Sequence, residues 1–232
     1  MLPAIIIWMI LRYREKRNTK KASVIPPGKP KKQLPPMTSI LLLILFLNFE
    51  TKGFSQNKIL NYQIIRNGTN VGTLSFSETS TGEIDHLKME SDVKTKFIFT
   101  FTAHASEEAV YSNGILLHSS IYRRLNGSEK VNKQHEANDR QYIIHAGERS
   151  EVTKAYPITY NMLSLYSKEP ESTSRVYSDN FQTFISIEKL GLHKYKITLP
   201  DGNYNYYYYK NGVLSLVEVH HSIYTASIVL TN

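Results

Sequence analysis

The chain has 232 residues, no cysteine, 28 lysines and arginines against 20 acidic residues, and a formal net charge of +8. The absence of cysteine excludes disulfides, thiolate metal sites, catalytic thiols and the lipidated cysteine of a bacterial lipoprotein. Ten of the basic and two of the acidic residues lie in residues 1–55, so the rest of the chain carries 18 of each and is neutral. A neutral domain offers few clustered cations to contact phosphates, and we therefore expect no nucleic-acid partner.

Residues 1–36 form a basic leader that has two interpretations. They contain a short apolar run, Leu2–Leu11, a basic stretch, Arg12–Lys21, and a proline-rich end. In the first interpretation translation starts at Met37, and the leader is an over-extended gene start. In the second the leader is the long, charged first part of an export signal.

Residues 37–55 are typical of a secretory signal peptide. The apolar run Ile40–Leu47 is much shorter than the roughly 20 residues that cross a bilayer as a helix, and it fits the core of such a signal. One residue separates Gly53 from Ser55, a small-x-small arrangement that predicts cleavage between Ser55 and Gln56. We therefore expect a periplasmic or secreted protein that is not a lipoprotein and has no integral membrane span in its mature part.

The predicted mature part, residues 56–232, alternates short strands with tight turns and fits a single antiparallel β domain. Asn-Gly and Asp-Gly readily adopt the positive φ angles of hairpin turns, and five such dipeptides occur. They begin at Asn67, Asn113, Asn126, Asp201 and Asn211. The residues between them alternate apolar and polar side chains with the period of a strand, which predicts an all-β antiparallel meander.

Two stretches carry further expectations. Lys94–Ala103 alternates aromatic and polar residues and is predicted to be one strand. In Pro157–Tyr166 the apolar residues recur with a helical period, which predicts one short helix that covers an end or face of the sheet.

The sequence resembles a family of exported bacterial proteins of unknown function, the domain of unknown function numbered 6134. The likeness rests on the stretch Tyr62–Gly72, YQIIRNGTNVG, on the central segment Tyr156–Tyr160, YPITY, and on the C-terminal run of strands. It extends over about Leu60–Leu230. The resemblance implies a strongly curved antiparallel sheet or an incomplete β-barrel, and it brings no catalytic residues or cofactor.

A tyrosine-rich stretch near the C-terminus supplies the candidate ligand-binding residues. Strand alternation places one set of rings on each face, so that one set packs in the core and the other lines an outer or concave surface. Such rings suit a sugar, a peptide or a lipid head, whereas the simpler interpretation is that tyrosine is a good strand former. The rings are Tyr204, Tyr206 and Tyr208 on one face, and Tyr207 and Tyr209 on the other.

Glu218 and His220 are the weak candidates for a metal or acid–base site. They share one face of a predicted strand, and a site would require a third group such as His86 or His118. An exposed polar strand face explains the same pattern. Motifs for serine hydrolases, P-loops, dinucleotide binding and zinc proteases are absent from the sequence.

These observations favour an exported, non-enzymatic β protein that needs no cofactor. In this hypothesis it binds an apolar or amphipathic small molecule, or an envelope protein, in the concavity of its sheet. One alternative is a hydrolase or metal-dependent enzyme that uses Glu218 and His220. Another is a structural or assembly protein of the cell envelope, which predicts a filled interior without a pocket.

Overall fold

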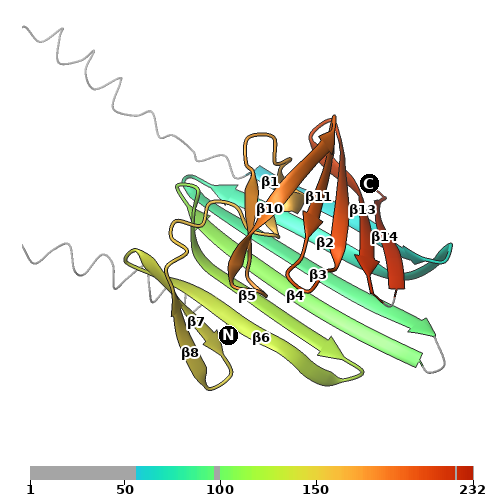
Figure 1. Ribbon diagram of the computed structural model, residues 1–232, viewed down its shortest axis with the longest axis horizontal. Coiled ribbons are helices and arrows are strands. Elements are labelled where there is room, and N and C mark those ends of the chain that lie inside the picture. The colour runs from blue at the N-terminus through green and yellow to red at the C-terminus, as the bar shows by residue number, and fades with distance from the viewer. Residues whose placement is uncertain (1–55, 97–99, 223, 232) are drawn as a thin grey trace, which may run out of the picture. The chain divides into compact units, whose positions relative to one another are not determined.

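The fold is known from a computed structural model that describes residues 56–96, 100–222 and 224–231 (Figure 1). The predicted leader and signal peptide lie outside these residues. The first eight strands are β1 (Gln56–Arg66), β2 (Thr69–Thr81), β3 (Ile84–Lys96), β4 (Thr100–Ser112), β5 (Ile115–Leu125), β6 (Ser128–Asn138), β7 (Gln141–Ala146) and β8 (Arg149–Thr153). After them come α3 (Ser164–Ser167), β9 (Arg175–Ser178), β10 (Thr183–Gly191), β11 (Lys194–Thr198), β12 (Tyr204–Lys210), β13 (Val213–His221) and β14 (Tyr224–Leu230).

All 14 strands belong to one antiparallel sheet with the order β8-β7-β6-β5-β4-β3-β2-β1-β14-β13-β12-β11-β10-β9. Neighbours in this order are consecutive in the chain except at the centre, where β1 pairs with β14 and Tyr62 lies opposite Leu230. The sheet is open, with β8 and β9 as its edges. The predicted all-β antiparallel meander is therefore confirmed, in the form of an open sheet.

The turn dipeptides behave as their chemistry predicts. At all four Asn-Gly turns both residues have positive φ, for example 48° at Asn67 and 74° at Gly68. Gly202 of the Asp-Gly turn has a φ of 85°. An asparagine or a glycine adopts this left-handed region at low cost, which allows the sharp reversals of a meander.

Two predicted elements differ in the structure. Lys94–Ala103 is not one strand, because Lys96 pairs with Thr100 and the chain reverses between β3 and β4. Pro157–Tyr160 has no regular secondary structure, and the helix is confined to α3. The backbone of this irregular part bonds to other elements: the carbonyl of Ile158 accepts the N–H of Leu116 at 2.8 Å, and these tertiary bonds replace a helical turn.

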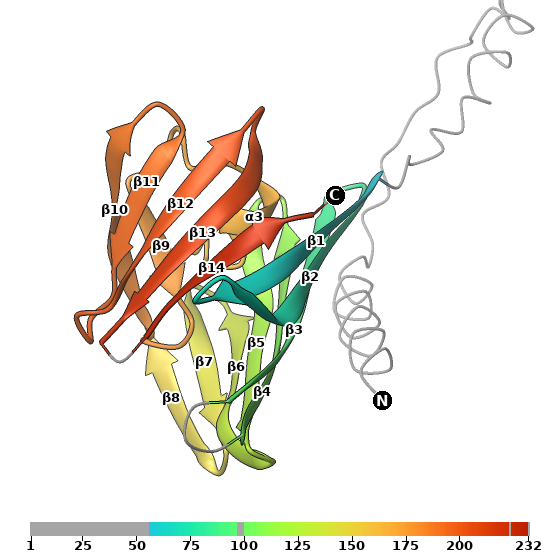
Figure 2. The same ribbon diagram turned by 90° about the vertical axis from the view of Figure 1, so that its right-hand side faces the viewer.

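The sheet bends back on itself, and the segment with α3 lies inside the bend (Figure 2). We call residues 154–174 the inner segment, and the face of the sheet that carries Tyr62 and Phe76 the inner face. Tyr166 of the inner segment places its ring 5.6 Å from that of Tyr62 and 5.9 Å from that of Phe76. Most of the bend is thus filled by a core of apolar and aromatic side chains.

Tyrosine hydroxyls form hydrogen bonds that connect different parts of this core across the bend. Tyr62 donates a hydrogen bond to the Leu214 carbonyl at 3.1 Å, and Tyr209 donates one to the Leu165 carbonyl at 2.8 Å. Buried polar groups are tolerated in a core when they are bonded in this way.

Candidate functional site

The tyrosine-rich strand β12 has an inner and an outer set of rings. Tyr207 and Tyr209 lie on the inner face and are only 3% and 6% exposed, so they belong to the core. Burial raises the pKa of Tyr207 to about 12. Tyr204, Tyr206 and Tyr208 lie half-buried on the outer face. Only these three rings of the five candidates are accessible to a ligand.

The outer rings form a surface with two lysines from β11. Lys194 Nζ lies 5.1 Å from the ring centre of Tyr206 and 4.9 Å from that of Tyr208, within the range of a cation–π contact. Lys196 Nζ lies 5.0 Å from the ring centre of Tyr204. We call these five residues the tyrosine–lysine face.

Glu218 and His220 lie on the same outer face, where each contacts a tyrosine of β12. Tyr208 donates a hydrogen bond to Glu218 at 2.7 Å, and the ring of His220 stacks on Tyr204 at 4.7 Å. The third groups expected for a catalytic or metal site are remote: β13 is four strands from β3, which carries His86, and six from β5, which carries His118. At a strand spacing of roughly 4.8 Å the nearer one is already about 19 Å away along the sheet. The structure therefore does not bring His86 or His118 to Glu218 and His220, and an enzyme built on this pair would need another third group.

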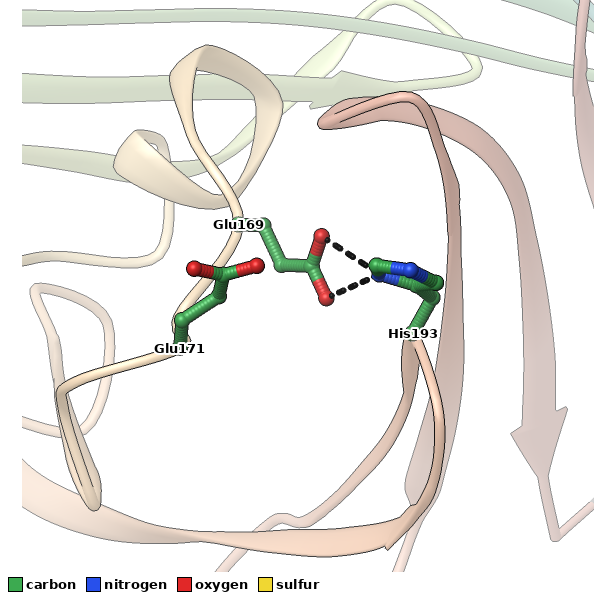
Figure 3. A group of neighbouring side chains, drawn as sticks. All are labelled: Glu169, Glu171 and His193. Carbon is green, nitrogen blue, oxygen red and sulfur yellow. Dashed lines mark hydrogen bonds and ion pairs between the residues drawn. The ribbon is translucent and has the colours of Figure 1, made fainter.

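A different group of metal-ligating side chains comes together beside the inner segment (Figure 3). Glu169 and Glu171 belong to that segment, and His193 lies in the turn between β10 and β11. One ligand atom from each lies within 4.8 Å of the others. His193 Nδ1 lies 3.0 Å from both carboxylate oxygens of Glu169. We call these three residues the Glu–Glu–His cluster.

A second side chain, in addition to His193, binds the carboxylate of Glu169. Tyr195 of β11 donates a hydrogen bond to Glu169 Oε1 at 2.7 Å. Burial, together with this carboxylate, raises the pKa of Tyr195, so its hydroxyl remains a donor. The Glu169 side chain is only 4% exposed, whereas that of His193 is 40% exposed. The cluster therefore has a fixed inner carboxylate and an accessible outer side.

A buried polar group, Asp179, contacts the inner segment at Asn161. Asp179 accepts hydrogen bonds from Ser119 at 2.5 Å and from Asn161 at 3.0 Å. Burial raises the pKa of Asp179 to about 6, and the two hydrogen bonds partly oppose this shift. Nearby, burial lowers the pKa of the fully buried His135 to about 4. His135 Nδ1 is 3.9 Å from Asp179 Oδ1, too far for a direct hydrogen bond.

A hollow of about 540 Å³ lies on the inner face near the sheet edge β8. Its floor is apolar, with Ile144 and Ala146 of β7, and its other lining side chains are polar or charged. These are Lys133, Glu148, Arg149, Glu151 and Gln182. Gln182 comes from the turn before β10, so the hollow lies between the two end regions of the open sheet. Lys133 is fixed there, because its Nζ donates a hydrogen bond to the Asn180 carbonyl at 2.6 Å.

Sequence reasoning found the tyrosines but missed these three sites. Glu169 and Glu171 are two residues apart, yet their histidine partner follows more than 20 residues later in a turn. The sequence contains one weak signal for the cluster, because Glu169 and Glu171 flank Pro170 after an apolar stretch. Asp179 and His135 carry no local motif.

The sequence matches a family described as "Domain of unknown function (DUF6134)" over residues 62–231. The chain belongs to this family. The predicted resemblance is thereby confirmed, and the DUF6134 match extends from β1 past the end of β14. No curated protein matches the sequence.

Among solved structures, the DUF6134 chain is similar to a β-barrel-like protein of Domain of Unknown Function DUF1849 from Brucella abortus. The two share 7% identity and a TM-score of 0.47, over 77% of this chain and 96% of that one. Within the part of the chain that the structure describes, no helix has the length and apolar character of a membrane span. Neither description names an activity, so function has to be argued from the residues.

Proposed function

We propose that this protein is an exported, non-catalytic binding protein that holds an amphipathic small molecule in the hollow on the inner face of its sheet. The observation that carries the proposal is the composition of that hollow. An apolar floor, Ile144 and Ala146, lies beside two cations, Lys133 and Arg149, and two carboxylates. A molecule with an apolar body and a charged or zwitterionic head is complementary to this arrangement.

The size of the hollow supports the same class of ligand. Small-molecule sites commonly have volumes of roughly 300–1,000 Å³, and 540 Å³ lies within this range. The inner segment and the core beside it fill most of the bend, so a much larger ligand would have to displace core side chains. Export is supported by the signal pattern of residues 37–55, and the family match over residues 62–231 lies entirely after the predicted cleavage site.

Native mass spectrometry of the protein, expressed as the full chain in a bacterial host, tests both export and ligand binding. We expect a chain that begins at Gln56 and carries a bound small molecule, or that binds a hydrophobic reporter dye in the folded state. A chain that retains residues 1–55 in the cytoplasm would contradict export. A folded protein with neither bound molecule nor dye affinity would contradict binding.

Two variants locate the ligand. Ala146→Trp fills the hollow and should weaken dye binding by at least about tenfold, and Arg149→Ser removes an exposed cation with little risk to the fold. Tyr206→Ser, on the tyrosine–lysine face, is the control and should leave binding unchanged. Loss of binding in Tyr206→Ser alone would place the ligand on the outer face and refute the proposed site.

A further inference from the structure

We propose that the Glu–Glu–His cluster binds a divalent transition-metal ion of the Zn²⁺ class. This inference is independent of the ligand proposed for the hollow. It rests on the donor set, the charge balance and the positioning of Glu169, Glu171 and His193.

The donor set selects the kind of ion. Two carboxylates and one imidazole are the ligands of many zinc sites, whereas Ca²⁺ and Mg²⁺ prefer oxygen alone. The three ligand atoms lie within 4.8 Å of one another. Two tetrahedral ligands at roughly 2.0–2.2 Å from one ion are about 3.4 Å apart, so binding requires a closure of no more than about 1.4 Å. Glu171 is exposed and can supply that movement.

The charge balance of the cluster favours a cation. Glu169 is nearly fully buried, and Glu171 places a second carboxylate beside it. Across residues 56–96, 100–222 and 224–231, the ion pair of Glu169 is with His193, and neither glutamate pairs with a lysine or an arginine. Two neighbouring carboxylates repel each other, and a divalent ion would offset this repulsion.

Neighbouring groups already hold two of the ligands in place. Tyr195 binds Glu169 Oε1, as a second-shell partner commonly does for a metal-ligating carboxylate. The His193 carbonyl accepts the N–H of Tyr209 at 2.9 Å, and His193 has a φ of 56°. The imidazole is thereby directed at Glu169 (Figure 3). A bound ion would join the inner segment to the β10–β11 turn.

Titration of the chelator-treated, purified protein with Zn²⁺ and Co²⁺ tests the site. We expect binding of one ion per chain, visible absorption of Co²⁺ typical of low coordination number, and a thermal midpoint raised by about 5–10 °C when Zn²⁺ is in 100-fold excess over its dissociation constant. Binding should weaken at low pH, because only the unprotonated imidazole ligates a metal.

Matched variants assign the effect to the cluster. Glu171→Gln and His193→Asn should each weaken Zn²⁺ binding by at least about tenfold, and asparagine is chosen because it tolerates a positive φ. Glu188→Gln and His145→Asn, at exposed and half-buried sites elsewhere in the sheet, should leave the affinity unchanged. The proposal would be overturned if the cluster variants and the control variants lost Zn²⁺ affinity equally. It would also be overturned if Zn²⁺ produced no thermal shift, or if the Co²⁺ spectrum were like that of the aqueous ion.

Discussion

Two histidine–carboxylate pairs lie beside the inner segment, and they differ in burial and in contact. His135 and Asp179 are both buried, and their closest atoms are 3.9 Å apart. His193 and Glu169 are 3.0 Å apart, and the imidazole is partly open to solvent. His135 lies in β6 and His193 in the β10–β11 turn, so both pairs include a histidine from outside the inner segment.

The comparison shows how burial and neighbouring charge give two histidine–carboxylate pairs different properties. In the His135–Asp179 pair, burial disfavours the charged form of each group, and neither side chain is open to solvent. In the His193–Glu169 pair, solvent reaches the imidazole and a second carboxylate adds negative charge. Only the second pair is therefore suited to binding an ion from solution.

The largest expected effects concern the buried His135–Asp179 pair. The two residues change the free energy of unfolding with pH in opposite directions. The folded-state pKa of His135 is lowered to about 4, so its contribution to stability is lost as the pH falls from about 6.5 to 4. The folded-state pKa of Asp179 is raised to about 6, so its contribution grows as the pH falls from about 6 to 4. Each contribution amounts to about 3 kcal/mol, and in the unmodified protein they largely cancel.

Single substitutions should separate the two contributions. Relative to the unmodified protein, Asp179→Asn should lose about 3 kcal/mol of unfolding free energy between pH 6.5 and 4, because only His135 then titrates. His135→Gln should gain a similar amount over the same range. Urea unfolding at several pH values measures both, and parallel pH profiles for all three proteins would contradict the assignment.

The next effect is the loss of the Asp179 acceptor at neutral pH. Asp179→Ala leaves the Ser119 hydroxyl and the Asn161 amide buried without their acceptor, and we expect a loss of about 2 kcal/mol. Urea unfolding at pH 7 is the measurement, with the exposed Glu188→Ala as control. A loss below about 0.5 kcal/mol would show that the buried network contributes little.

A smaller effect is expected where the imidazole is open to solvent. His193→Asn in metal-free protein should lower the free energy of unfolding by under about 1 kcal/mol, because partly exposed pairs contribute little. Thermal or urea unfolding with a chelator present measures this. A loss as large as that of Asp179→Ala would mean that the two pairs are equally structural.

The smallest effect is expected for Glu171, which is exposed. Without metal, Glu171→Gln should change stability by no more than about 0.5 kcal/mol, and relief of repulsion with Glu169 makes a slight gain the expected sign. Unfolding with and without a chelator checks this. A clear destabilisation in chelator would show that Glu171 has a structural partner.

The strands and turns were largely predictable because their signals are local. Each Asn-Gly pair determines a reversal within two residues, and the alternation of β12 correctly separated Tyr207 and Tyr209 from the outer rings. The edge strands β8 and β9 were missed because they are short, and β8 is exposed along most of its length. The helix was overextended because the residues before α3 bond to the sheet instead of to one another.

The sites depend on contacts that local patterns do not encode. His193 and Glu169 meet only because the inner segment returns beside the β10–β11 turn, and no spacing rule relates a turn histidine to a carboxylate 24 residues earlier. Asp179 and Ser119 are 60 residues apart. A strand pattern predicts which face a side chain takes, but not which distant segment will cover that face.

The pairing of β1 with β14 has a consequence for the order of folding. Each half of the sheet, β1–β8 and β9–β14, consists of contacts between strands that are consecutive in the chain, and such contacts form quickly. The central contact joins strands more than 150 residues apart, with Ile64 opposite Ile228. During folding, β1 therefore remains an unpaired edge until Tyr224–Leu230 joins it, and the sheet is completed from its middle.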